Sequence, residues 1–452
     1  MGILDEFTGA VPGPRGQDER TLAATVRQHV VARLAVYADE REDAGLAPED
    51  EAARRETVGR LLADELAEQR RLALSRGGRV LEVAVEERIA QAVRDALFGT
   101  GSLERLLADT SIENICVNGC DVVWIKDAGG VWRRRPPVAA SDAELVELVR
   151  TLAASTGGEE RRFDRGMPRL NLQLPDGSRL FAVMAVTGRV SLTIRRHRFP
   201  AASMAELVRL GVCDEDLAAF LAALVRARKN IVIGGGTNIG KTTVLRAFAH
   251  EIPPEERIVT IEDTFELGLD VNVEAHPNVV AMQAREPNIE GQGGIDQAEL
   301  VRWGLRMSPD RVIVGEIRGA EVIPMCNAMS QGNDGSLSTI HASTSRGVFT
   351  KLASYAAQSP ERLTLEATNL MVASAVHFVV HLGWDAKGCR VIDSVREVID
   401  ADGAQVVSNE VYRPGPDGRA MPGAPLRTET VHDLVEAGWD PQPVAHARWG
   451  DR

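Results

Sequence analysis

The sequence predicts an α/β protein with three structured parts: a helical N-terminal extension, a smaller α+β domain, and a larger domain built around a mostly parallel sheet. Its 452 residues allow two or three domains of ordinary size. In the larger part, apolar β-branched runs at Ile231–Ile233, Ile258–Ile261 and Val312–Val314 alternate with helical stretches. This alternation is typical of βαβ units, whose parallel strands are buried on both faces.

Residues 1–85 are predicted to form the helical extension. Thr21 to Arg41 and Glu51 to Ser75 carry Leu, Val and Ala at steps of three and four residues, with charged residues between them. That spacing favours amphipathic helices. Neither segment contains a chemical motif, so we expect a docking or connecting role for this part.

Residues 86–200 are predicted to form the smaller α+β domain. An amphipathic helix at Glu86–Phe98 precedes short β-like runs, which are separated by turn signals such as Asn118-Gly119 and Pro175-Asp176-Gly177. The predicted strands are Ile115–Asn118, Val122–Lys126, Asn171–Leu174, Arg179–Val186 and Val190–Arg195.

Residues 201–412 are predicted to form the larger domain, and residues 413–452 a loose C-terminal tail. The domain begins with helical connectors from Ser203 to Lys229 and ends with a β-hairpin of Arg390–Ile399 and Ala404–Tyr412. Residues 413–427 are rich in Pro and Gly, which disfavours packed structure and is the reason for predicting a loose tail.

Charge, cysteine content and targeting signals limit the class of protein. Lys and Arg number 52 against 65 Asp and Glu, and this net charge of −13 disfavours a general role in coating nucleic acid. Five scattered cysteines without a C-x-x-C pair indicate a reducing compartment. The N-terminus lacks a targeting pattern, and the apolar stretch Leu370 to Leu382 contains His377 and His381 and is too short to span a bilayer. We expect a cytoplasmic protein, held at a membrane at most by a partner.

The strongest chemical signal follows the first apolar run of the larger domain. Gly235 to Thr242 matches G-x-x-x-x-G-K-[ST], directly before a helical pattern from Val244 to His250. Glycines let backbone N–H groups surround phosphate oxygens, while Lys241 is expected to reach the β- and γ-phosphates and Thr242 to supply a hydroxyl to Mg²⁺. The predicted cofactors are ATP and Mg²⁺. The predicted nucleotide-binding residues are Gly235, Gly236, Thr237, Asn238, Ile239, Gly240, Lys241, Thr242 and Thr243.

Two later apolar runs are each followed by acidic residues. Val312-Ile313-Val314-Gly315-Glu316 has the form of a Walker B segment, in which Glu316 polarises the attacking water or holds the Mg²⁺ shell. Glu262 and Asp263 follow another strand, and two adjacent carboxylates there suit a cation that bridges phosphates. A charged surface turn is the alternative for that pair. Glu262 and Lys241 are predicted to be catalytic with Glu316, and the predicted metal ligands are Thr242, Asp263 and Glu316.

A fourth segment, Gly332 to Ala342, places small and polar residues before a strand that ends in His341. A single histidine at such a position is more often packed or solvated than catalytic. The order of all four segments is what favours a functional His341 here.

That order resembles the type II/IV secretion-system ATPase superfamily and, within it, the CpaF-like (TadA) branch that powers Flp/Tad pilus assembly. The resemblance runs from about Leu97 to Tyr412. Its supporting strings are Gly101-Ser102-Leu103-Glu104-Arg105-Leu106-Leu107-Ala108-Asp109, Asn118-Gly119, Leu174-Pro175-Asp176-Gly177-Ser178-Arg179, Leu192-Thr193-Ile194-Arg195-Arg196, Pro287-Asn288-Ile289-Glu290-Gly291 and Leu305-Arg306-Met307-Ser308-Pro309-Asp310-Arg311.

The resemblance implies a homo-hexameric ring with each nucleotide between an N-terminal domain and a RecA-like motor domain. It also implies an inner-membrane platform protein as partner, a peripheral location at the inner face of the cell membrane through that partner, and no specific nucleic acid. Glu262 and Asp263 fall in the family's Asp box, Glu316 in its Walker B box, and His341 closes its His box.

Arginines are expected to complete the site. The resemblance places Arg179 and Arg195 of the smaller domain as stabilisers of charge on the γ-phosphoryl group, with a surface role as the alternative. Arg302, Arg306 and Arg318 flank the Walker B segment and are weaker candidates for sensing a neighbouring subunit.

The sequence departs from the family pattern at two places. Asn333 stands where a second histidine is usual, and Asn cannot exchange a proton near neutral pH. Asn238-Ile239 stands where Gly-Ser is commoner, with little effect expected because backbone atoms carry that part of the loop.

Two other functional hypotheses remain open. A RecA-like DNA translocase or helicase would need a basic DNA-facing surface, and an assembly scaffold that binds ATP without turnover is motivated by Asn333. The retained Lys241, Thr242, Glu262 and Glu316 favour turnover. A GTPase would need an Asn-Lys-x-Asp string, which the sequence lacks.

Overall fold

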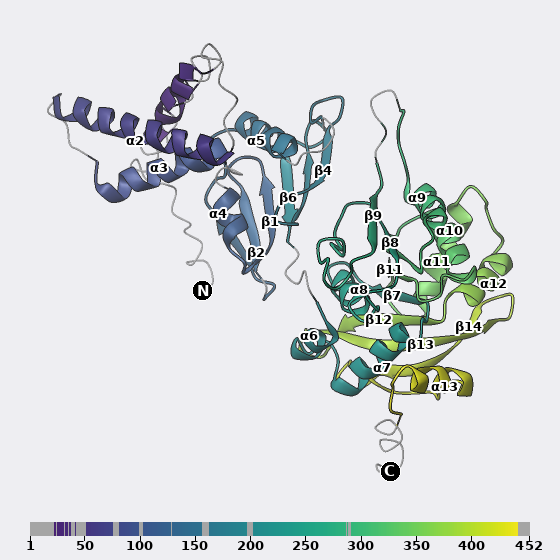
Figure 1. Cartoon of the computed structure of the whole chain (residues 1–452). Coiled ribbons are helices and arrows are strands. Elements are labelled where there is room, and N and C mark those ends of the chain that lie inside the picture. The colour runs from purple at the N-terminus through teal and green to yellow at the C-terminus, as the bar shows by residue number, and fades with distance from the viewer. Residues whose placement is uncertain are drawn as a thin grey trace, which may run out of the picture. The chain divides into compact units, whose positions relative to one another are not determined.

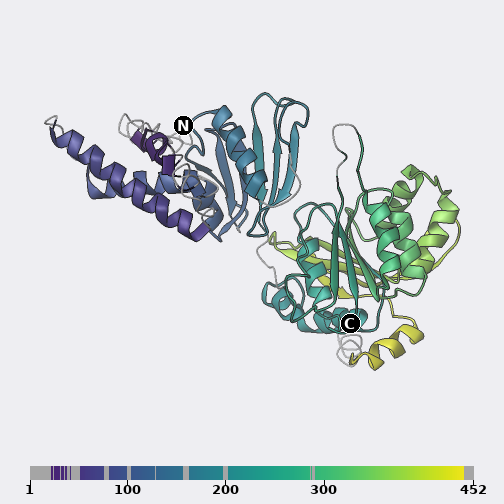
Figure 2. The ribbon, with the colours of Figure 1, turned by 45° about the horizontal axis from the view of Figure 1, so that its top comes forward.

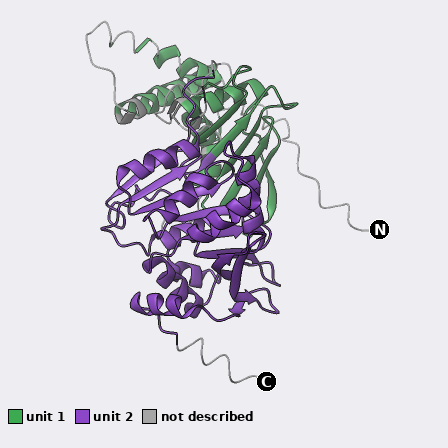
Figure 3. Cartoon of the chain, turned by 90° about the vertical axis from the view of Figure 1, so that its right-hand side faces the viewer, with its two compact units in different colours: residues 1–172, 180–196 green, residues 173–179, 197–452 purple. Residues whose placement is uncertain are grey.

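The computed structural model of the chain forms two compact units, which are coloured separately in Figure 3. Unit 1 comprises Met1–Leu172 and Leu180–Arg196, and unit 2 comprises Gln173–Arg179 and His197–Arg452. The residues that the structure describes are 22–23, 25–30, 32–34, 36–37, 41, 51–75, 81–98, 103–127, 129–155, 162–196, 202–285, 287 and 291–441. The predicted domain boundary near residue 200 and the family string at 288–290 lie outside the described residues.

Unit 1 begins with helices that have a small apolar core of their own. The helices are α2 (Glu51–Ser75) and α3 (Val83–Phe98), and the described residues between 22 and 41 are also helical. Their buried residues include Val26, Leu62 and Ile89. The helices predicted at 51–75 and 86–98 are therefore confirmed.

A six-stranded sheet follows, in the order β3-β2-β1-β6-β5-β4. Alternate residues point to one buried face, as the fully buried Ile115, Val117 and Ile194 show. All five predicted strands are present, whereas β3 was not predicted because its Trp-Arg-Arg-Arg sequence lacks apolar alternation. The elements are α4 (Leu103–Ala108), β1 (Ile112–Asn118), β2 (Val123–Asp127), β3 (Trp132–Arg135), α5 (Asp142–Ser155), β4 (Arg169–Gln173), β5 (Arg179–Val183) and β6 (Ser191–Arg195).

Unit 2 is built on a nine-stranded sheet in the order β15-β14-β13-β12-β7-β11-β10-β8-β9. The strands from β12 to β9 in this order are parallel, and β13, β14 and β15 extend the sheet in antiparallel fashion. The predicted parallel core and C-terminal hairpin are confirmed. The strands are β7 (Ile231–Gly235), β8 (Ile258–Glu262), β9 (Val279–Gln283), β10 (Arg311–Ile317), β11 (Leu337–His341), β12 (Phe378–Trp384), β13 (Arg390–Ala401), β14 (Val406–Pro414) and β15 (Ala420–Pro422).

Helices cover both faces of this sheet (Figures 1 and 2). One apolar core joins the sheet to α6 (Met204–Arg209), α7 (Glu215–Arg226), α8 (Lys241–Ala249) and α13 (Thr428–Glu436). A second core joins it to α9 (Gln297–Gly304), α10 (Val322–Ser330), α11 (Gly347–Gln358) and α12 (Leu365–Ala375). A 3-10 turn, η1 (Leu305–Met307), extends α9. Because the parallel strands share one direction, their carboxyl ends meet at one edge of the sheet, where ligands bind in such folds.

The prediction of a loose tail from residue 413 is wrong for the described residues up to 441. Beyond the Pro- and Gly-rich segment, α13 buries Leu434 completely, and the Trp439 ring lies 5.4 Å from that of Phe220. The fully buried carboxylate of Glu397 accepts a hydrogen bond of 2.6 Å from Thr430 Oγ1 and a backbone N–H from Arg427. The apolar residues Leu434 and Trp439 therefore pack this segment onto the core, although its Pro- and Gly-rich composition disfavours packed structure. Residues 442–452 lie outside the described part.

None of the helices within the described ranges has both the length and the apolar character that crossing a bilayer requires.

Candidate nucleotide-binding site

The predicted P-loop is a strand, a tight turn and a helix. β7 ends at Gly235 and α8 begins at Lys241, with the turn passing through positive φ at Asn238 (60°) and Gly240 (105°). Asparagine and glycine are the residues that adopt such φ values most readily. The Ile239 side chain is buried, and a Cβ at Gly235 would lie only 2.8 Å from its Cγ2 atom. Ile239 therefore anchors the turn in the core, a role beyond the backbone contribution expected from sequence.

Lys241 is buried at the start of α8, and its ammonium group contacts the loop that precedes it. Its Nζ donates to the carbonyl oxygens of Gly236 (2.9 Å) and Gly235 (3.3 Å). The same atom lies 3.0 Å from Nδ1 of His341. The positive charge thus stands beside the backbone N–H groups of the helix start, as phosphate binding requires.

His341 links this lysine to the Walker B carboxylate. It ends β11, directly opposite Gly235 of β7 in the register, and its Nε2 lies 2.6 Å from Oε1 of Glu316. Because an ammonium group can only donate, Nδ1 must accept from Lys241. The ring proton is therefore on Nε2, which donates to Glu316. One neutral imidazole satisfies both neighbours.

Glu316 lies in β10 and is held as a carboxylate. Burial acts to raise its pKa, but the hydrogen bond from His341 and the charge of Arg318 outweigh burial and lower the pKa to about 2. Arg318 Nη2 lies 2.5 Å from Glu316, and its Nη1 lies 3.1 Å from Asp263. A carboxylate with so low a pKa is a weak base near neutral pH, so it is better suited to orienting water or holding a cation than to storing a proton.

The two adjacent carboxylates at the end of β8 face different surroundings. The Asp263 side chain is partly exposed and contacts Arg318. It also lies 3.4 Å from Arg179, the first residue of β5, which ends the segment 173–179 that is grouped with unit 2. Arg179 in turn lies 3.0 Å from Glu266. Glu262 is buried, and its Oε1 accepts the backbone N–H groups of Glu266 and Leu267, each at 2.9 Å. Burial raises the pKa of Glu262 to about 7. Asp263 is thus placed to meet a ligand, whereas Glu262 holds the turn after β8.

We expect Glu262→Gln to stabilise the protein at neutral and higher pH. Because the pKa of Glu262 rises from 4.5 to about 7 on folding, the stability that its proton contributes below pH 4.5 is lost as the pH rises through 7. An amide oxygen can still accept both N–H groups without that titration. The gain should reach about 2–3 kcal/mol above pH 7 and vanish near pH 4.5. Melting curves across this pH range, with Glu299→Gln as control, measure it. A stability difference independent of pH would contradict the prediction.

The oxygen donors present suit a hard cation. Thr242 follows Lys241 in the first turn of α8 and is half-buried, and it offers a hydroxyl, while Asp263 and Glu316 offer carboxylates. Mg²⁺ prefers such oxygen ligands and usually takes only one or two carboxylates from the protein. Within the described residues no group of three or more His, Cys, Asp or Glu side chains forms a metal site. The donor set thus fits a Mg²⁺ ion whose remaining ligands are phosphate and water oxygens.

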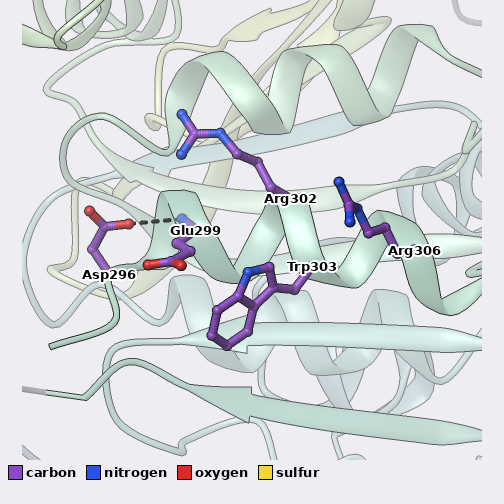
Figure 4. Close-up of a pocket in the computed structure, with 5 residues that line it drawn as sticks. All are labelled: Asp296, Glu299, Arg302, Trp303 and Arg306. Carbon is purple, nitrogen blue, oxygen red and sulfur yellow. Dashed lines mark hydrogen bonds between the residues drawn. The ribbon is translucent and has the colours of Figure 1, made fainter. Parts of the chain in front are cut away.

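Several predicted arginines lie elsewhere. Arg195 lies in β6 of unit 1, paired with Asn114 of β1. Arg302 and Arg306 lie along α9 and η1 and line a surface hollow of about 350 Å³ (Figure 4). Arg302 lies 3.3 Å from Glu361. The other residues of that hollow are Asp296, Glu299 and Trp303. The P-loop and the Walker B carboxylate take no part in it.

Asn333, which stands where the family pattern usually has a second histidine, lies away from Lys241, His341 and Glu316. It precedes β11, whereas His341 ends that strand, and the length of the strand from Leu337 to His341, about 13 Å, lies between the two. The Asn333 Nδ2 donates to the carbonyl of Pro309 at 2.6 Å, and its carbonyl accepts from Ser336 Oγ. Asn333 therefore fixes the turn at the amino end of the strand.

The sequence analysis gave Arg318 a different role and gave His381 no functional role. Arg318 was expected to sense a neighbouring subunit, but its guanidinium pairs with Glu316 and Asp263 of its own chain. Its position two residues after the Walker B glutamate was the available signal. His381 stands inside an apolar run and gives no local signal.

A P-loop beside a Walker B carboxylate on a parallel sheet defines a P-loop nucleoside triphosphatase. Residues 97–417 match the family model of Type II/IV secretion system proteins, and the chain belongs to this family. It is an ATPase, and unit 2 is an α/β domain built on a mostly parallel sheet.

The relatives are secretion and transfer proteins. A Mycobacterium tuberculosis protein provisionally named for conjugal transfer is 34% identical over 331 residues, which cover 71% of this chain and 90% of the relative. The type IV secretion system protein PtlH of Bordetella pertussis is 32% identical over 316 residues, covering 63% of this chain and 88% of PtlH. The crystal structure of the Brucella suis VirB11 ATPase, solved with sulphate, is 27% identical with a TM-score of 0.36, covering 65% of this chain and 92% of VirB11.

Proposed function

We propose that the chain is a Mg²⁺-dependent, ATP-hydrolysing hexameric motor that powers Flp/Tad (type IV-like) pilus assembly or type II/IV secretion from the cytoplasmic face of the membrane. The observation that carries the proposal is the hydrogen-bonded row Lys241–His341–Glu316, which joins three separate sequence motifs at one edge of the sheet. Family membership over residues 97–417 supports a role in a secretion or pilus assembly machine. The strings that resemble the CpaF-like (TadA) branch favour pilus assembly among these roles.

The row accounts for the chemistry that this chain can supply. Lys241 and the first N–H groups of α8 neutralise and orient the triphosphate. Glu316, held ionised by His341 and Arg318, accepts a hydrogen bond from the attacking water and aligns it. A bound Mg²⁺, held by Thr242 with Asp263 or Glu316, would neutralise charge that develops on the β- and γ-phosphates.

We expect activity to depend on ring assembly. Arg179 and Arg195 are proposed to stabilise charge on the γ-phosphoryl group, and a site completed by another domain or subunit is active only when assembled. Specific activity should therefore fall with dilution, in parallel with the hexamer seen by light scattering in an ATP analogue. Full specific activity in a species that stays monomeric would exclude the ring requirement.

We expect His341 to matter more than Asn333. His341→Ala removes the group that connects Lys241 to Glu316, so turnover of assembled rings should fall at least about tenfold, or roughly 1.4 kcal/mol in barrier. Asn333→Ala removes hydrogen bonds at the far end of β11 and should cost less, and Asn333→His should be tolerated. Steady-state ATPase rates of the three variants decide the matter. If His341→Ala turns over at the wild-type rate, the histidine is structural.

Two experiments test whether the protein acts with a membrane partner and whether it powers pilus assembly or secretion. Pull-down of the intact protein from membranes, followed by identification of co-purifying polytopic proteins, tests the inner-membrane platform partner. A deletion strain complemented with wild type or Lys241→Ala tests the output, because pili or secreted protein should return only with wild type. Return of both with Lys241→Ala would contradict a motor role.

The name of the Mycobacterium tuberculosis relative favours conjugal transfer as a second candidate. The same deletion strain discriminates the two. Loss of transfer frequency with unchanged surface pili and unchanged protein secretion would favour this candidate over the first.

A further inference from the structure

A buried histidine–aspartate pair lies in the sheet beside the P-loop strand. β12 runs parallel to β7, and His381 stands opposite Gly234 in their register. His381 is buried, and its Nδ1 lies 2.7 Å from Oδ1 of Asp393 on the neighbouring strand β13. Its Nε2 lies 3.3 Å from the carbonyl oxygen of Ala342. A buried ionisable pair on a P-loop sheet is unusual enough to require an explanation.

Both ring nitrogens of His381 face hydrogen-bond acceptors. A carboxylate and a carbonyl oxygen can only accept, so each contact is favourable when the ring nitrogen that faces it carries a proton. On the β7 side the ring faces Gly234, which offers no side-chain partner. His381 therefore bridges β13 and the segment after β11.

A glycine on β12 makes room for the pair. A Cβ at Gly383 would lie 2.2 Å from Oδ2 and 3.0 Å from Cγ of Asp393, so a side chain there would displace the carboxylate. On β7, a Cβ at Gly234 would lie 2.6 Å from Cγ2 of Val348 and 3.3 Å from Cδ2 of His381, so its tightest contact is with α11 rather than with the pair.

The pair acts on the residue that follows His341. The N–H of Ala342 donates to the carbonyl of Gly235 at 3.3 Å, while its own carbonyl accepts from His381. Ala342 is therefore fixed on both sides, by the P-loop strand and by β12. The direction in which the chain leaves β11 sets where the preceding imidazole points.

We infer that His381 is a positioning residue for ATP hydrolysis: held by Asp393, it fixes Ala342 and thereby keeps His341 between Lys241 and Glu316. The inference rests on the proposed role of His341. A second anchor keeps the same segment folded, because Ser345 accepts hydrogen bonds of 2.8 Å from Ser394 and from Arg396 of β13. Loss of His381 should therefore misplace His341 without releasing the segment.

The test compares two replacements of similar volume. His381→Gln keeps an N–H group that can reach Ala342, whereas His381→Leu fills the space and donates nothing. We expect His381→Leu to lower kcat about tenfold while the Kd of a fluorescent ATP analogue changes less than about threefold. His381→Gln should stay within about threefold of the wild-type kcat. His377→Leu is the control, since His377 immediately precedes β12, at the end of the strand away from His381, and its Nδ1 accepts from the Asn230 N–H.

A second variant guards against misfolding of the first. Gly383→Ala keeps both partners but denies Asp393 its position, so it should lower kcat with the same small effect on Kd. Melting temperatures show that rates are measured on folded protein. Wild-type kcat in both His381→Leu and Gly383→Ala, or equal kcat for His381→Leu and His381→Gln, would overturn the inference.

Combination with His341→Ala separates this inference from the proposed function. If His381 acts through His341, the double variant His341→Ala/His381→Leu should be no slower than His341→Ala alone. Losses that multiply would overturn the inference while leaving His341 in its role. A wild-type rate for His341→Ala would overturn that role and the positioning inference with it, a result distinct from failure of His381 alone.

Discussion

Lys241→Ala should abolish ATP turnover and weaken nucleotide binding. The ammonium group is buried beside the start of α8 and contacts carbonyl oxygen atoms of the loop and the His341 ring. Lys241 begins α8, next to the backbone N–H groups that would surround the phosphates. Its removal leaves the charge of the triphosphate uncompensated at a partly buried site. Binding of a fluorescent ATP analogue and phosphate release measure the two effects.

Lys351→Ala is the matched control for that experiment. Lys351 lies in α11 of the same unit, 4.9 Å from the centre of the Tyr355 ring, away from the P-loop. It should keep wild-type binding and turnover. If Lys241→Ala behaved like this control, the turn at 235–242 would be a glycine-rich loop without a nucleotide.

Glu316→Gln should keep nucleotide binding and lose turnover by at least about a hundredfold. The wild-type carboxylate receives hydrogen bonds from two donors, His341 and Arg318. An amide would turn its own donor toward one of them and could no longer align water with a full negative charge. Binding should survive because the P-loop and Lys241 are untouched.

The measurement is single-turnover hydrolysis at saturating ATP, with Glu299→Gln as control. Glu299 lies in α9 and lines the separate surface hollow. Equal turnover by wild type and Glu316→Gln would falsify the Walker B assignment. A loss of binding with turnover would instead indicate that Glu316 mainly holds the metal.

The parts of the site that the sequence predicted are those with local rules. The P-loop follows from residues adjacent in the chain, and a carboxylate after a buried strand reaches the same edge because parallel strands align their carboxyl ends. His341 consequently lies within hydrogen-bond distance of both Lys241 and Glu316. The same logic predicted β7, β8, β10 and β11 and a mostly parallel sheet, but it did not predict β9, β12 or β15.

The failures arose where the sequence does not say which way a side chain points or where a strand ends. Glu262 and Asp263 are adjacent, yet one is buried among backbone N–H groups and the other is partly exposed. Asn333 shares a motif with His341 but lies beyond the opposite end of β11. Pairs far apart in sequence, such as His381 with Ala342, depend on how β12 and β11 flank β7, which no local pattern encodes.

The packing of α13 also sets an order of events during protein synthesis. Phe220 of α7 meets Trp439, and the core that they share includes Val244 and Phe248 of α8, the helix that follows the P-loop. More than two hundred residues separate the first partner from the last, and contacts of such long sequence separation form late in folding. Trp439 can join this core only after translation has passed it, so a chain truncated before α13 leaves Phe220 without that contact. The core behind α8 and the P-loop is therefore completed by the last helix of the described chain.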